Sequence, residues 1–145
     1  MPTTTQATAH RRFDLATLKT APGRALGEYM NECLDGTARY DRERERSRYL
    51  SPSAIRAAGR AIWPANVLER VNNGHGVRNA VMAVYRDAID ALVELPRVLL
   101  DHNLNSDDRA ASVNEAAGAQ DFLEAAAETG FVSGAPIPAA WLSRR

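Results

Sequence analysis

The sequence predicts an all-α protein, a small helical bundle of about five helices with extended N- and C-terminal arms. Apolar side chains recur at intervals of three and four residues, the period of one helical face, and the alternation typical of strands is missing nearly everywhere. Capping and turn residues separate the periodic stretches. The length of 145 residues suits one domain. We therefore expect an extended N-terminal arm (1–12), a helical domain (13–130) and an extended C-terminal tail (131–145).

The domain begins with one apolar helix, followed by a charged one. Thr20 can cap a helix whose first turn takes Pro22, and we expect that helix to stop at Gly36. Over residues 38–50, opposite charges stand three residues apart, which favours a second helix that faces solvent. The apolar face of the first helix consists of Leu26, Tyr29, Met30, Cys33 and Leu34. Because Cys33 lies on this apolar face, we expect it to be a small core residue.

Three prolines mark the helices in the middle of the chain. Ser51 and Pro52 form a cap and a first-turn proline, and Pro64 is expected to kink or break the helix that follows. Residues 72–76, Asn-Asn-Gly-His-Gly, predict a turn. The clearest helix follows it, and we expect Pro96 to interrupt that helix.

The last helix has few large side chains. Asn105 or Ser106 caps it and Gly130 ends it. Alanine and glycine occupy most of its apolar positions, so the helix that packs against it must come close. The tail 131–145 is apolar but broken by prolines, which predicts an extended segment laid across a surface.

No residue pattern indicates catalysis, a metal or a cofactor, so we expect a protein that is not an enzyme. The three histidines are scattered, and Lys19, the only lysine, lacks the glycine spacing of a phosphate-binding loop. An enzyme would instead have to gather His75 or His102 with carboxylates in a pocket. The best metal candidate is a cluster that helix capping explains more simply: Asp101, His102, Asp107 and Asp108.

Arginines crowd the first half of the chain, which keeps nucleic-acid binding open as an alternative. Such residues contact phosphates, although the acidic residues between them neutralise much of the run. An Arg-dependent nucleic-acid-binding protein would use Arg42, Arg44, Arg46 and Arg48.

The two ends of the chain favour protein binding instead. Isolated extended segments do not recover the entropy lost when they become ordered, so the arm and the tail gain little by folding alone. We predict a non-enzymatic structural or interaction protein, a small subunit held by its terminal arms in a larger assembly with a protein partner or as a homo-oligomer. No apolar run approaches the roughly 20 residues of a membrane span, so no membrane partner is expected. The expected partner-binding residues are Phe131, Ile137, Trp141 and Leu142.

The composition suggests a setting for this assembly. Arginine supplies 17 of the 18 basic residues and alanine occurs 26 times, as codon bias in a GC-rich genome would produce. Bacterial or bacteriophage origin follows, with a virion component as one setting and the cytoplasm as the location otherwise. A phage or bacterial inhibitor protein that binds a host enzyme is a further alternative.

Overall fold

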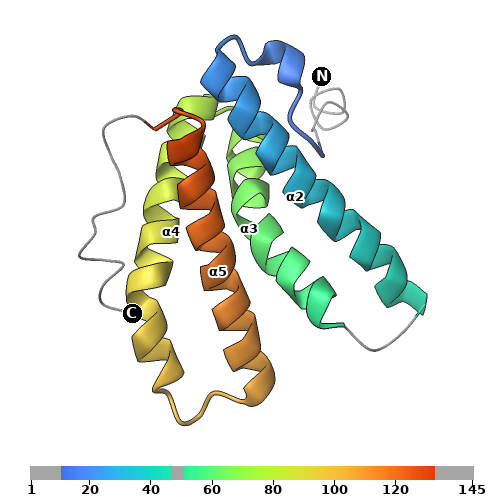
Figure 1. The fold of residues 1–145 in the computed structure, drawn as a ribbon, viewed down its shortest axis with the longest axis vertical. Helices are drawn as coiled ribbons and strands as arrows, with labels where there is room; N and C mark the ends of the chain where they lie inside the picture. Colours follow the sequence, from blue (N-terminus) through green and yellow to red (C-terminus); the bar gives the residue numbers. More distant parts are fainter. Residues whose placement is uncertain (1–10, 47–50, 133–145) are drawn as a thin grey trace.

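The chain folds as a bundle of four α-helices preceded by one 3-10 turn (Figure 1). The computed structural model describes residues 11–46 and 51–132, with backbone only for 38–46. The all-α class is confirmed for this part of the chain, which holds no strand. The expectation of about five helices is wrong by one. The expected arms lie outside the described residues, except for residues 11, 12, 131 and 132. The elements are η1 (Leu15–Thr17), α2 (Ala21–Arg46), α3 (Pro52–Asn72), α4 (Val77–Leu99) and α5 (Ser106–Glu128).

The helix count differs because Gly36 does not stop the first helix. α2 runs through it without a break, so the charged stretch continues the same helix instead of forming a second one. A glycine inside a helix costs only about 1 kcal/mol, and no capping residue reinforces a stop there.

Neither internal proline ends its helix. α3 continues through Pro64 to Asn72, and α4 continues through Pro96 to Leu99. Pro64 is buried beside Trp63 and Val67 in the core, so packing offsets the backbone hydrogen bond that the proline removes. Pro96 stands within the last turn of α4, and the helix ends three residues after it.

The caps expected from the sequence are confirmed. The Thr20 hydroxyl accepts a hydrogen bond from the Gly23 amide at 3.1 Å, and Ser51 caps α3. The Asn105 side chain accepts from the Asp108 amide at 2.8 Å, which settles the cap of α5. Gly130, just after α5, has a φ of 78°, a left-handed conformation that favours glycine.

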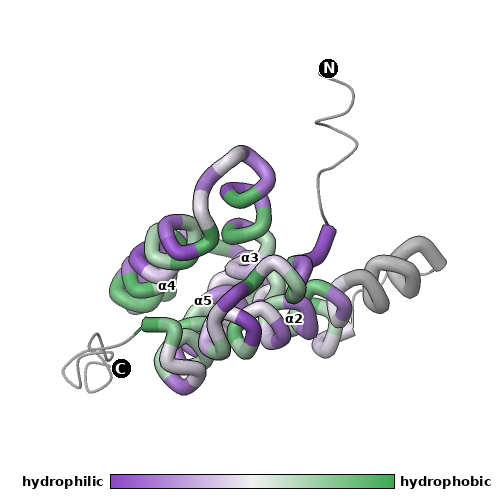
Figure 2. The backbone as a smooth tube through the Cα atoms, turned by 90° about the horizontal axis from the view of Figure 1, so that it is seen from above, coloured by the Kyte–Doolittle hydropathy of each residue, from purple (hydrophilic) through white to green (hydrophobic). Residues whose placement is uncertain are grey.

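α3 is the central helix of the bundle and contacts α2, α4 and α5. Figure 2 shows α2 and α4 on opposite sides, with α3 and α5 between them. The helices converge at the end where α2 and α4 begin, and the pairs α2–α3 and α4–α5 spread apart toward the other end (Figure 1). The largest fully buried side chains of the core include Leu26, Met30, Val67, Val81, Val84, Phe122 and Leu123.

α3 and α5 pack backbone against backbone. A Cβ atom placed on Gly118 would lie 2.2 Å from the carbonyl oxygen of Gly59, and one placed on Gly59 would lie 2.5 Å from that of Asn114. Nearby, the Trp63 indole N–H donates to the Glu115 carbonyl at 3.0 Å. The close approach expected for the alanine-rich helix is thereby confirmed, and the contact leaves no room for a larger residue at either glycine.

Replacing Gly118 with alanine should destabilise the bundle. The added methyl group meets rigid backbone, so the two helices must separate, and we expect the free energy of unfolding to fall by about 2 to 3 kcal/mol. Urea unfolding followed by circular dichroism measures the change. The matched control is Gly36→Ala in α2, where a Cβ meets nothing within 4 Å. It should gain about 0.5 to 1 kcal/mol, and equal stability of the two variants would contradict the packing argument.

Candidate functional site

Of the four partner-binding residues predicted from the sequence, only Phe131 lies in the described part of the chain. It is half-buried against the core, and Val132 beside it is buried, with its amide donating to the Ala126 carbonyl at 3.1 Å. Ile137, Trp141 and Leu142 lie outside the described residues. The first two residues of the tail therefore fold with the bundle and fix the point from which the tail departs.

The predicted arginine run lies at the far end of α2. Arg42, Arg44 and Arg46 belong to its last turns, where the structure describes only backbone, and Arg48 lies outside the described residues. Several arginines elsewhere in the bundle pair with carboxylates. The ion pairs are Arg12–Asp35 at 3.1 Å, Arg60–Asp121 at 3.5 Å, Arg70–Asp87 at 3.7 Å and Arg97–Glu94 at 3.9 Å.

His75 does lie near carboxylates, as the enzyme alternative requires. It lines a hollow of about 300 Å³ together with Glu69 and Asp87. Asp87 is already paired with Arg70, and the remaining lining residues are asparagines, so the hollow presents no Ser, Thr or Cys nucleophile. As it stands, the hollow is a polar surface feature without a nucleophile for covalent catalysis.

The acidic residues of the metal candidate stabilise the backbone of their own loop and helix. Asp101 accepts a hydrogen bond from the Asn103 amide at 2.9 Å, while Asp107 and Asp108 occupy the first turn of α5, where the helix dipole favours anions. His102 is exposed in the connecting loop. Among the described residues, no group of three His, Cys, Asp or Glu side chains is arranged to hold a metal ion.

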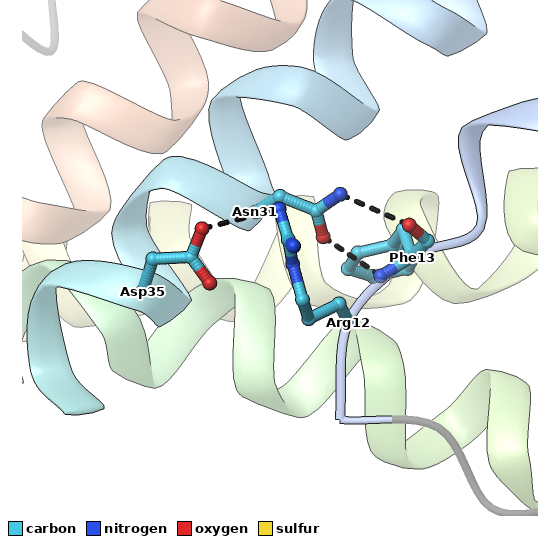
Figure 3. Close-up of polar contacts among 4 residues, drawn as sticks. All are labelled: Arg12, Phe13, Asn31 and Asp35. Carbon is cyan, nitrogen blue, oxygen red and sulfur yellow. Dashed lines mark hydrogen bonds and ion pairs between the residues drawn. The ribbon is translucent and has the colours of Figure 1, made fainter.

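A buried amide fixes the N-terminal segment on α2 (Figure 3). Asn31, only 4% exposed, accepts from the Phe13 amide at 2.7 Å and donates to the Phe13 carbonyl at 2.9 Å. The Arg12–Asp35 ion pair lies next to this clamp at the edge of a groove of about 720 Å³ between α2 and α3. Arg56 lines the groove, as Arg12 does, together with several carboxylates, so the charge of the groove is mixed. The two hydrogen bonds between Asn31 and Phe13, which we call the clamp, fix the point at which the N-terminal arm joins the bundle.

Cys33 is a buried core thiol, as its helical position predicts. It is 3% exposed beside Tyr29, whose ring lies 5.8 Å from the Arg60 guanidinium. Burial, more than any nearby charge, raises the pKa of the Cys33 thiol. Burial and then the neighbouring Cys33 raise the pKa of the Tyr29 hydroxyl. Both groups therefore stay protonated at neutral pH, and Cys33 lacks the thiolate character of a reactive cysteine.

The feature that stands out from an ordinary bundle surface is an apolar row along α4. At about 100° per residue, four apolar side chains of this helix and its C-cap residue Leu100 lie within about 60° of one another, on a face about 100° away from the one that enters the core. We call this set the α4 row: Met82, Ile89, Val93, Pro96 and Leu100.

The described residues leave the far half of this row uncovered. Met82 and Ile89 are partly buried against the core, but Val93 is 52% exposed and Leu100 is 75% exposed. α4 has no buried residue after Ala88, because the α4–α5 pair extends away from α2 and α3 there (Figure 1). On α5, Val113 is 45% exposed as well. Pro96 is exposed between Val93 and Leu100, and exposed apolar side chains that lie together on one face are a candidate contact surface.

Reasoning from the sequence missed this row. The apolar stripe of Val81, Val84 and Leu92 is enough to predict this helix, and that prediction includes no second apolar row. The sequence does contain a signal for the row. The apolar positions around α4 form two rows, and only one of them can pack into the core. Asp87, Asp90 and Glu94 are exposed and give α4 a polar face.

Comparison with protein-family models, with curated proteins and with solved structures finds no match for the chain. None of the described helices combines the length and the apolar content that a membrane crossing requires.

Replacing Asn31 with alanine should release the N-terminal segment. The buried backbone groups of Phe13 would lose both partners, so we expect a loss of about 3 kcal/mol in the free energy of unfolding. Faster hydrogen exchange at the Phe13 amide, with protection retained in α5, would show that the loss begins at the clamp. The control is Asn79→Ala on the exposed face of α4, which should change stability by less than about 0.5 kcal/mol. Unchanged exchange at Phe13 would contradict the clamp.

Stability should fall at alkaline pH because of Cys33. Its pKa is raised in the folded chain, so its contribution is fully present below the ordinary thiol pKa of about 8.5 and disappears as pH rises toward the folded value. One such group changes the free energy of unfolding by at most about 1.4 kcal/mol per pH unit. We expect Cys33→Ala to flatten the decline between pH 8 and pH 10 in urea titrations. Parallel profiles for the two proteins would show that the thiol does not contribute.

Proposed function

We propose that the chain is a non-enzymatic helical interaction protein, a subunit of a larger assembly that contacts other protein chains through the α4 row. The observation that carries this proposal is the exposure of Val93 and Leu100. The core-facing residues of α4 are already buried by the other helices, so these two side chains are not needed for the core. Complete burial of a fully exposed aliphatic side chain contributes about 1.5 to 3 kcal/mol, and a partner would gain the part of this that corresponds to the 52% exposure of Val93 and the 75% exposure of Leu100.

The chemistry of the row suits a protein surface as its partner. Its members are all apolar, and charged residues flank them, Arg97 at 86% side-chain exposure among them. An apolar centre with a charged rim is the usual anatomy of a protein interface.

The remaining parts of the sequence-based expectation stay predictions. They include a role of the terminal arms in holding the subunit, the choice between copies of the chain and a different protein partner, the bacteriophage or cytoplasmic setting, and the inhibitor and nucleic-acid alternatives. The arms and the arginine run fall mostly in residues whose side chains the structure does not describe.

Glutamate at Val93 and Leu100 should weaken association at least tenfold. A buried contact cannot accept two unpaired carboxylates, and tenfold corresponds to about 1.4 kcal/mol. Size-exclusion chromatography with light scattering measures the complex, first with the pure chain over a range of concentrations and then in native extract. The control is Ile62→Glu, the same kind of change on α3, where Ile62 is 38% exposed.

Association that survives Val93→Glu with Leu100→Glu would contradict the proposal, as would a chain that remains free at every concentration and in extract. Association that Ile62→Glu abolishes as well would assign the contact to another surface and contradict it too.

A further inference from the structure

We infer that the partner of the α4 row is a second copy of this chain, whose own α4 packs antiparallel against the first around a two-fold axis. The inference rests on the proposed function and deepens it, because it names what binds the same surface. A two-fold contact uses one surface twice, so that surface must be complementary to itself. The spacing of the apolar residues and the placement of the charges beside them both meet this condition.

The C-terminal part of the row has a spacing that is the same in both directions along the helix. Its members stand four, three and four residues apart, and they are Ile89, Val93, Pro96 and Leu100. In an antiparallel pair of helices, Ile89 of one copy can therefore lie level with Leu100 of the other. In the same register, Val93 lies level with Pro96. A partner of different sequence needs no such symmetry, so the pattern favours a second copy.

The position of α4 in the bundle makes the row accessible to a second helix. α4 lies on the side of the bundle opposite α2 (Figure 2). Beyond Ala88 it has no buried residue, because the α4–α5 pair extends away from α2 and α3 there (Figure 1). The stretch from Ile89 to Leu100 is about 16 Å long. A helix of the second copy can pack along this stretch without displacing α2 or α3.

Charged residues beside the row are placed to pair between the two copies. At about 100° per residue, Arg86, Asp90 and Arg97 lie within about 40° of one another, on the flank next to Val93. All three are exposed. In an antiparallel pair, the two-fold axis brings this flank against the same flank of the second copy. The register set by the apolar residues then places Asp90 of one copy within about 3 Å, measured along the helix axis, of the level of Arg97 of the other.

The charges therefore favour the antiparallel orientation. The two-fold axis forms the ion pair of Asp90 with Arg97 twice, and it places Arg86 near the end of the second α4, where exposed Asp101 follows Leu100. A parallel pair would instead bring the charged flank against the opposite flank of the row. That flank presents Tyr85 and Leu92 at these levels. Only the antiparallel pair gives each of these charges a complementary charge across the contact.

Reversal of two charges tests the pairing on the full chain. Asp90→Arg and Arg97→Asp each bring like charges together, so each variant alone should dimerise at least about tenfold more weakly than the unchanged chain at low salt. An equal mixture of the two variants restores both ion pairs, and its heterodimer should have a dissociation constant within about threefold of the original. Sedimentation velocity over a range of concentrations measures the constants. The control is Asp87→Arg, the same change on the same helix about 120° away from Val93, which should leave dimerisation unchanged.

Engineered cysteines measure the orientation of the two helices. In a mixture of Ile89→Cys and Leu100→Cys chains, mild oxidation should join one chain of each kind, because the two positions lie level across the contact. Leu100→Cys alone is the control and should stay reduced, since its two copies lie about 16 Å apart along the helix axis. Cys33 is buried and should not react in either sample.

Three results would overturn the inference. They are a pure chain that stays monomeric up to about 1 mM, a mixture of the charge variants that associates no better than either variant alone, and a disulfide between two Leu100→Cys chains, which would show a parallel pair. In each case the proposed function still stands if association, with copies or in native extract, depends on Val93 and Leu100. The proposed function fails separately, when no association depends on these two residues.

Discussion

The contact between Gly59 and Gly118 is the constraint on which the arrangement of the bundle depends. With no side chain at either position, α3 and α5 meet through their backbones, and Trp63 and Arg60 close the contact by reaching Glu115 and Asp121. Such close approach gives many small van der Waals contacts in place of a few large side chains. It makes the alanine-rich α5, which has little hydrophobic surface of its own, a full member of the core.

This contact also explains why part of the hairpin is left without cover. α3 is committed to α5 on one side and to α2 on the other, and α2 is held in turn by the segment that Asn31 clamps. Neither helix remains free to cover α4 beyond Ala88. The exposure of the α4 row thus follows from the way the described helices pack, since a further element would be needed to bury it.

Exposed aliphatic residues carry a free-energy cost in water that a partner removes when it buries them. The helices of the bundle are already held by their own contacts, so a partner that binds the α4 row does not need to rearrange them.

The sequence by itself determined the helical class, the caps at Thr20, Ser51 and Asn105, the stop at Gly130 and the close packing of α5, because each rests on local geometry or on residue size. It did not determine that α2 passes Gly36, where a glycine costs only about 1 kcal/mol and no capping residue reinforces a stop. Nor did it determine that α3 passes Pro64, where burial in the core offsets the local cost of the proline. The exposed row on α4 was decided by tertiary structure alone. Periodicity shows which faces of a helix are apolar, but only the placement of the other helices decides which of these faces is covered.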